Sequence, residues 1–363
     1  MKHSEMLEKF KDSKTAQLLL GQLNFIKDNY NFMEVCGTHT VQIFKTGVRD
    51  ALPKNIRMLS GPGCPVCVTA TEDIDKAISI AKNSDVVLFC FGDMIKVPGS
   101  RESLENVRSH TQLMYSPLEA LEFAKNNLSK KVVLFGVGFE TTIPAFAATL
   151  MRAKKEKVNN LLIFPVFKLI PPAIMAILSS KNINIDGFIL PGHVSTIIGK
   201  KEYEFIAKKF KIPAVITGFE VVDILEALVL LCQMREKNKP EINLEYSRVV
   251  RSDGNRLARD MVYKVFKKTD ARWRGIGRIP NSGLKLNRAF KEFDVDSVLD
   301  VRIKSTQEDK RCLCGSVLKG IVTPLECKLF GRECRPQTSV GPCMVSSEGT
   351  CATYYKYGVN QNV

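Results

Sequence analysis

The cysteine-rich tail contains the residues whose type and spacing most clearly indicate chemistry. Six of the eleven cysteines fall between residues 312 and 351, among glycine and proline turns, and they are Cys312, Cys314, Cys327, Cys334, Cys343 and Cys351. Thiolates bind both structural zinc and iron–sulfur clusters, and zinc sites favour tight C-x-x-C pairs. The tail has no such pair. Its wide, irregular spacing favours a [4Fe-4S] cluster held by Cys312, Cys327, Cys334 and Cys351.

Other interpretations of the tail stay open at this point. Zinc would use the same thiolates, and a set of buried free cysteines would need no metal at all. Six candidates for four ligand positions also leave a surplus. Spacing does not decide whether Cys314 or Cys343 replaces one of the four assigned cluster ligands.

A C-x-x-C motif, Cys64-Pro65-Val66-Cys67, follows a predicted strand in the N-terminal half. In thioredoxin-like sites this spacing allows a reversible disulfide and lowers the pKa of one thiol. The pair would otherwise be half of a metal site. We favour a redox dithiol, because the only other thiol nearby is Cys36 and no four-ligand set completes itself locally.

Cys36 begins the string Cys36-Gly37-Thr38-His39, directly after a predicted strand that ends at Val35. Open parallel sheets place ligand sites outside the carboxyl ends of their strands. A thiolate beside an imidazole offers a soft metal ligand with a proton donor or acceptor, or a cysteine nucleophile activated by His39. The plainer alternative is a buried cysteine and a core-facing histidine.

Polar loops follow other predicted strands in the same manner and are expected to line one cleft. These loops span residues 91–100, 136–142 and 191–195, and the last contains His193 as a site-lining residue. Gly136-x-Gly138 lacks the third glycine at position 141, so NAD binding is not predicted.

Short apolar runs bounded by glycine or proline alternate with amphipathic helical stretches, which is typical of parallel α/β structure. The predicted strands are 32–35, 56–59, 86–91, 132–135, 161–164, 188–190 and 214–216; the clearest helices are 72–82, 117–127 and 221–235. We therefore predict an α/β fold with two similar parallel-sheet domains, 28–130 and 131–240. A helical N-terminal segment, 1–27, precedes them, and a C-terminal iron–sulfur domain, 241–363, follows; packing of the segment on this third domain is one option.

Bulk composition narrows the function classes. Hydrophobic residues make up 45% and charged residues 25%, as in an ordinary globular protein. The net charge of +15 is spread along the chain without aromatic-interleaved basic runs, so no nucleic-acid role is predicted. The first ten residues lack the apolar core of a secretory signal, and no membrane span is expected. We predict a cytoplasmic protein whose cysteines serve metal or redox chemistry.

With these motifs in view, the sequence resembles the HypD family of hydrogenase maturation factors. The resemblance covers nearly the whole chain and rests on several strings in the same order: Cys36-Gly37-Thr38-His39, Gly61 to Cys67, Phe91 to Met94, Gly138 to Thr142, Pro191 to Ser195 and Gly341 to Gly349.

The resemblance implies a scaffold for the Fe(CN)2CO unit of [NiFe] hydrogenases. It implies that Cys36 binds the iron jointly with a small HypC-type chaperone, that Cys64 and Cys67 form a redox dithiol, and that a HypE-type protein delivers cyanide. It also implies a [4Fe-4S] cluster on Cys312, Cys327, Cys334 and Cys351. The alternative from a different class is a stand-alone thiol-dependent iron–sulfur oxidoreductase acting on a small substrate.

Overall fold

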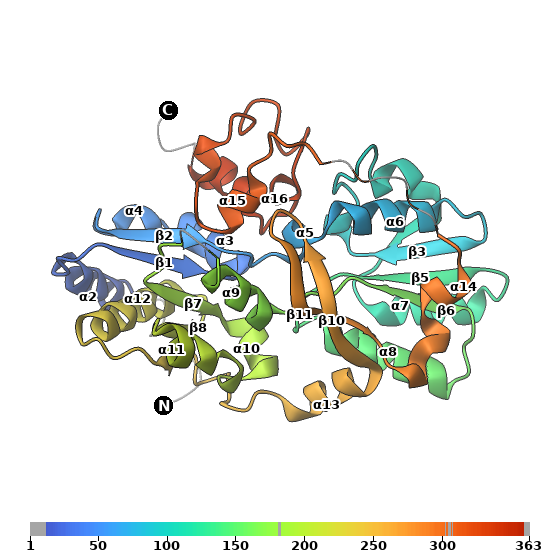
Figure 1. The fold of residues 1–363 in the computed structure, drawn as a ribbon, viewed down its shortest axis with the longest axis horizontal. Helices are drawn as coiled ribbons and strands as arrows, with labels where there is room; N and C mark the ends of the chain where they lie inside the picture. The colour runs from blue at the N-terminus through green and yellow to red at the C-terminus, as the bar shows by residue number, and fades with distance from the viewer. Residues whose placement is uncertain (1–11, 181–182, 302, 304–305, 307, 359–363) are drawn as a thin grey trace.

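Two parallel sheets, a long hairpin and a cysteine-rich cap make up the structure, a computed structural model that describes residues 12–180, 183–301, 303, 306 and 308–358 (Figure 1). The first eleven residues of the predicted N-terminal segment lie outside this description. Among the described residues, no helix is both long enough and apolar enough to cross a membrane.

The first sheet has five parallel strands in the order β2-β1-β7-β8-β9. Its strands are β1 Tyr30–Glu34, β2 Ile56–Ser60, β7 Gly187–Pro191, β8 Ala214–Thr217 and β9 Ile242–Leu244. Most positions of β7 and β8 are buried, as expected for strands covered by helices on both faces.

The second sheet has four parallel strands in the order β4-β3-β5-β6. Its strands are β3 Val86–Cys90, β4 Thr111–Leu113, β5 Lys131–Gly136 and β6 Leu161–Pro165. The predicted α/β class with two parallel sheets is confirmed, and every predicted strand is present.

The sheets do not follow the predicted boundaries at residues 130 and 240. Strand β1 pairs with β7, with Met33 aligned to Phe188 in the core, so β1 and β2 share one sheet with β7 and β8. The chain leaves the first sheet after β2, completes the second sheet, and returns at β7. Strand β9 then extends the first sheet beyond residue 240.

Helices cover both sheets and surround the loops at the strand ends. The α-helices are α2 Ser13–Asn24, α3 Gly37–Lys45, α4 Val48–Ala51, α5 Pro65–Val68, α6 Thr71–Ala81, α7 Pro117–Asn126, α8 Ile143–Lys155, α9 Ile170–Leu178, α10 Gly192–Ile198, α11 Glu204–Phe210, α12 Val221–Glu236, α13 Arg256–Val265, α14 Val295–Val298, α15 Cys314–Leu318, α16 Pro342–Val345 and α17 Thr350–Thr353. The shorter turns are η1 Gly92–Met94, η2 Leu104–His110, η3 Lys201–Tyr203, η4 Arg288–Phe293, η5 Pro324–Glu326 and the π-helical η6 Tyr354–Gly358.

Local sequence explains where the predicted helices begin. Helix α7 starts with Pro117 behind a capping box, in which the Ser116 and Glu119 side chains satisfy backbone N–H groups that the first turn leaves unpaired. Helix α12 uses Glu220 and Asp223 in the same way.

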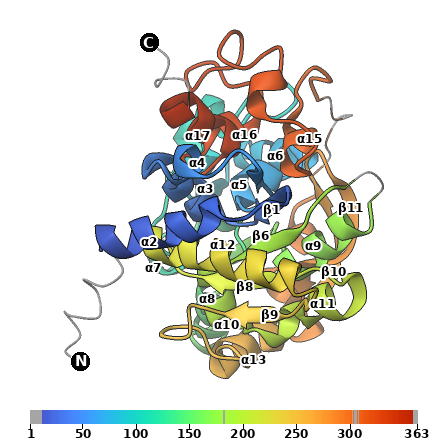
Figure 2. The ribbon, with the colours of Figure 1, turned by 90° about the vertical axis from the view of Figure 1, so that its left-hand side faces the viewer.

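Helix α2 packs against α12 on the outside of the first sheet, and Figure 2 shows the two helices side by side. Leu23 of α2 is fully buried there. The described part of the N-terminal segment thus packs with its apolar face on the apolar surface of α12.

An antiparallel hairpin, β10 Phe266–Trp273 and β11 Gly277–Leu286, joins the two sheets (Figure 1). Trp273 is 1% exposed, stacks on Phe139 at 6.0 Å, and donates from Nε1 to Ser282 Oγ at 2.8 Å. The next residue, Arg274, donates its backbone N–H to the Val68 carbonyl. The hairpin thus ties the loop after β5 to the loop after β2.

We expect Trp273→Ala to lower the free energy of unfolding by about 3–5 kcal/mol, because it opens a cavity where the two sheets meet. Urea unfolding followed by far-UV circular dichroism measures this. As a control, Leu128→Ala should change stability by less than about 0.5 kcal/mol, since Leu128 is 79% exposed. Equal effects of the two substitutions would contradict the joining role of the hairpin.

Candidate functional site

The loops that follow β1 and β2 cross in direct backbone contact. The Gly37 N–H donates to the Gly63 carbonyl at 2.9 Å, and the Gly61 N–H donates to the Glu34 carbonyl at 2.7 Å. A Cβ on Gly63 would lie only 2.2 Å from the Cys36 nitrogen. Glycine at position 63 is therefore required for the two cysteine loops to meet.

Cys36 is the N-cap residue of α3, between a buried carboxyl and the first turn of the helix. Glu34 accepts a hydrogen bond from the Cys36 N–H at 3.0 Å and another from Thr40 Oγ1 at 2.6 Å. Burial raises the pKa of Glu34 to about 8. A carboxyl at the end of an apolar strand thus fixes the backbone that presents the Cys36 thiol.

The Cys36 thiol is itself 7% exposed. Burial raises its pKa to about 12, while the backbone N–H groups of His39 and Thr38 act in the opposite direction. The thiol is therefore neutral at physiological pH. Metal binding would have to displace its proton, with the helix N-terminus favouring the resulting thiolate.

His39 lies beneath Cys36 and is fully buried. Its Nε2 is 2.7 Å from the Gly218 carbonyl, which makes Nε2 the protonated nitrogen, and Nδ1 has no hydrogen-bond partner. Burial lowers the pKa of His39 to about 4. The imidazole is therefore neutral, and its role beside Cys36 stays a prediction.

An aromatic stack connects the two histidines near the site. Phe219 lies between His39, at 4.6 Å, and His193, at 4.1 Å, with nearly parallel rings in both pairs. His193 also lines the cavity in front of Cys36, as predicted. The contact of Phe219 with both histidines depends on tertiary structure, because the three residues lie far apart in the sequence.

Two adjoining cavities open onto the thiols. The first, of about 440 Å³, exposes Cys36, and the second, of about 450 Å³, exposes Cys64. They share Pro65, Thr142 and Glu348 as a common wall. The predicted polar loops line these cavities, so the expected single cleft is divided in two.

Glu348 is a wall residue that the sequence analysis did not single out as a site residue. Its Oε1 accepts a hydrogen bond from Thr38 Oγ1 at 2.8 Å, which links the cysteine-rich cap to α3. Glu348 lies in the tail string Gly341 to Gly349, and this was the only sequence feature from which its place in the site could have been predicted.

The Cys64–Cys67 pair lies at α5, where Cys64 Sγ accepts the Cys67 N–H at 3.3 Å. Burial raises the pKa of Cys67 well above its ordinary value. The predicted lowering of a thiol pKa is therefore not found at Cys67. Burial in apolar surroundings raises the pKa of the thiol by more than the nearby helix N-terminus lowers it.

The two surplus cysteines of the tail form a separate pair. Cys314 Sγ and Cys343 Sγ are 2.9 Å apart, and the Cys343 thiol also interacts with Cys67. The hydrogen bond with Cys343, together with burial, raises the pKa of Cys314. Buried thiols thus run from Cys64 through Cys67 and Cys343 to Cys314.

The remaining four tail cysteines line one small cavity beside that pair, together with Cys314 and Cys343. Cys334 is buried and accepts the Val340 N–H at 3.4 Å, and the other three, Cys312, Cys327 and Cys351, are partly buried. Burial raises the pKa of Cys312 to about 12. The segment around Gly341 packs tightly against Cys312, since a Cβ on Gly341 would lie 2.8 Å from Cys312 Sγ.

The four thiols assigned to the cluster lie on separate segments around one cavity. Among the described residues, no three histidine, cysteine or acidic side chains converge closely enough to hold one metal ion. A [4Fe-4S] cluster takes one thiolate on each of four irons and so accepts donors from separate loops. The assignment of Cys312, Cys327, Cys334 and Cys351 stays a prediction, which the separate pairing of Cys314 with Cys343 favours.

Comparison with known proteins adds an independent finding. A family model described as HypD, hydrogenase formation hypA family, matches residues 14–358. The chain is 43% identical over 340 residues to the hydrogenase maturation factor HypD2 of Bradyrhizobium diazoefficiens, covering 91% of this chain and 90% of the relative. It is 41% identical over 329 residues to hydrogenase maturation factor HypD of Escherichia coli K12, covering 90% and 88%, respectively.

We expect iodoacetamide to label Cys36 at pH 8 at least about a hundredfold more slowly in the folded, metal-free protein than in urea, because only the thiolate reacts. Peptide mass spectrometry measures the rates. The folded-state rate should keep rising between pH 8 and 11, since burial raises the Cys36 pKa to about 12. The rate in urea should level off near pH 9.

Gly63→Ala should accelerate this labelling, because the added Cβ pushes the loop away from Cys36. Gly21→Ala is the matched control, since nothing lies within 4 Å of the Cβ position at Gly21. Folded-state labelling that levels off near pH 9 would contradict the burial argument.

Proposed function

Since this chain belongs to the HypD family and acts in hydrogenase maturation, we propose that it carries and reduces iron during assembly of the Fe(CN)2CO unit of [NiFe] hydrogenases. The observation that carries the proposal is the approach of two thiol sites, Cys36 and Cys64, on loops that cross at Gly63. One site binds the iron and the other supplies electrons.

Cys36 is the proposed iron ligand. A soft thiolate suits low-spin iron that carries cyanide and carbon monoxide, and a partner protein would supply a further thiolate. The cavity in front of Cys36 leaves room for both. Because the free thiol is neutral, iron arrival and proton loss must occur together.

Cys64 and Cys67 are the proposed electron source for the iron site. Oxidation of this dithiol to a disulfide releases two electrons and two protons. Exchange with the Cys343–Cys314 pair, which adjoins Cys67, would restore the dithiol. A [4Fe-4S] cluster on Cys312, Cys327, Cys334 and Cys351 would supply single electrons at the far end of this row of thiols.

Two partners are proposed, a small HypC-type chaperone at Cys36 and a HypE-type cyanide donor. Apolar side chains support a docking surface beside the thiols, since Leu113 and Tyr115 are 40% and 91% exposed and line the Cys64 cavity. Such an exposed rim favours a scaffold over a stand-alone enzyme with an enclosed substrate pocket. We assign this role to the cytoplasm, where thiols stay reduced.

Anaerobic purification followed by iron and sulfide analysis tests the metal content. We expect about four sulfides per chain, with about five irons in the wild type and about four in Cys36→Ala, because Cys36→Ala loses only the carried iron. Cys232→Ala, which removes a buried cysteine of α12, should retain all of the iron. Zinc in place of iron, or equal iron in all three proteins, would contradict the proposal.

We expect Cys64→Ala to abolish iron-bound cyanide formation in an assembly reconstituted with both partners, because the dithiol can no longer form a disulfide. Infrared spectroscopy of the cyanide stretch measures this. Cys90→Ala, a buried cysteine at the end of β3, is the matched control and should leave the signal intact. Full cyanide formation in Cys64→Ala would show that the electrons take another route.

A further inference from the structure

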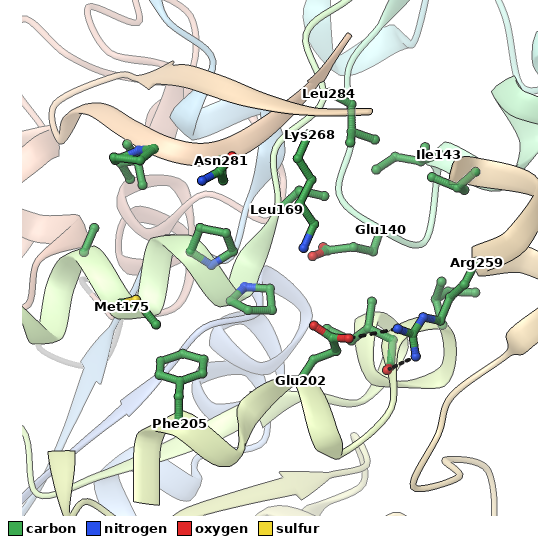
Figure 3. A pocket seen from close by; sticks show the side chains of 18 of the residues that line it. Glu140, Ile143, Leu169, Met175, Glu202, Phe205, Arg259, Lys268, Asn281 and Leu284 are labelled. Carbon is green, nitrogen blue, oxygen red and sulfur yellow. Dashed lines mark hydrogen bonds and ion pairs between the residues drawn. The ribbon is translucent and has the colours of Figure 1, made fainter. Parts of the chain in front are cut away.

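A further cavity lies behind the loop of residues 136–142, and none of the cysteines lines it. We call it the rear cavity; its volume is about 540 Å³. Helices α9, α10, α11 and α13 and the β10–β11 hairpin enclose it, so it lies where the two sheets and the hairpin meet (Figure 3). Cavities of this size at such junctions are the usual sites for small ligands.

The lining of the rear cavity is mostly apolar. Its apolar side chains come from every enclosing element, and they include Ile143, Leu169, Pro172, Met175, Phe205 and Leu284. An apolar ligand body would gain by leaving water for this surface.

One buried carboxyl points into the rear cavity with an unpaired oxygen. Glu140 is 6% exposed, and its Oε1 accepts the Ile170 N–H at 2.9 Å. Its Oε2 has no hydrogen-bond partner, and Figure 3 shows the carboxyl directed into the cavity. Buried polar atoms are almost always hydrogen-bonded, so this oxygen indicates a missing donor.

The other charged groups define what that donor can be. Arg259 is already used by Glu202, at 2.9 Å, and by the carbonyls of Ile198 and Asp253. Lys268 approaches from β10 with its Nζ facing the Glu140 carboxyl (Figure 3). The Lys268 ammonium would repel a cationic head group of a ligand. The Glu140 carboxylate would repel an anionic head group. A neutral head with both a donor and an acceptor suits the two together.

We propose that the rear cavity binds a small uncharged amphipathic molecule, with an apolar body between α9 and α13 and a primary amide or hydroxyl head that donates to Glu140 Oε2. The site is separate from the thiols and does not depend on the proposed iron chemistry. Burial raises the pKa of Glu140 to about 7, which agrees with a carboxyl that tolerates a neutral partner.

The test uses 4-phenylbutanamide as the probe and the full chain, with saturation-transfer NMR and calorimetric titration as readouts. We expect sub-millimolar binding. The N,N-dimethyl amide, which keeps the apolar body but has no N–H donor, should bind at least about tenfold more weakly. Glu140→Gln should weaken the parent amide by a similar factor, because the Gln amide that replaces Oε2 presents a donor to a donor.

A steric pair of variants locates the probe. Ala176→Phe places a ring in the cavity from α9 and should abolish binding, whereas Ser180→Phe adds the same ring at a position that does not line the cavity and should preserve binding. Circular dichroism verifies that each variant is folded. No binding at about 1 mM, or binding unaffected by Ala176→Phe, would overturn the proposal. Equal affinity for both amides would overturn the role of Glu140.

Discussion

The close approach of Gly63 to the backbone of Cys36 is the constraint on which the whole thiol site depends. Neighbouring parallel strands end at the same edge of a sheet, so the loops after β1 and β2 are brought to one place by topology alone. Direct contact requires more, because any side chain at position 63 would overlap the Cys36 nitrogen. The missing Cβ at Gly63 therefore allows the loop that carries Cys64 to lie against the loop that carries Cys36.

Burial controls the reactivity of the thiols that this contact brings together. It raises the pKa of Cys36, Cys67 and Cys312, although helix N-termini lie beside the first two. A neutral buried thiol is a poor nucleophile and a poor target for oxidants. Burial therefore keeps these thiols in the neutral, less reactive form in the metal-free protein.

The sequence predicted seven of the nine described strands in the two sheets, because each of the seven is a short apolar run closely followed by glycine or proline. Strands β4 and β9, with three residues each, were missed. The sequence did not predict which strands share a sheet. The pairing of Met33 with Phe188 joins residues 155 positions apart, and local periodicity contains no information on such a contact. The hairpin was missed for a different reason, since most of β10 is exposed and charged and lacks an apolar run.

The site residues likewise divide into those that local sequence identifies and those whose roles depend on long-range contacts. Cys36, Cys64 and the tail cysteines were identified from residue type and spacing, which depend only on neighbours in the chain. The hydrogen-bond partner of His39 could not be predicted, because the Gly218 carbonyl lies 179 residues away. Glu34 stands out locally as an acidic residue in an otherwise apolar strand. Its function in holding the Cys36 backbone depends on a hydrogen bond from the Cys36 N–H, which the tertiary structure shows.

The loop of residues 136–142 connects the thiol site to the rest of the molecule. Phe139 lines the Cys36 cavity and stacks on Trp273, whereas the next residue, Glu140, faces the rear cavity. Hydrogen bonds from the Val166 and Lys168 N–H groups to the carbonyls of Gly136 and Gly138 hold the backbone between them. Neighbouring residues of one hydrogen-bonded loop therefore line two different cavities, and this is how a single loop contributes a wall to each of them.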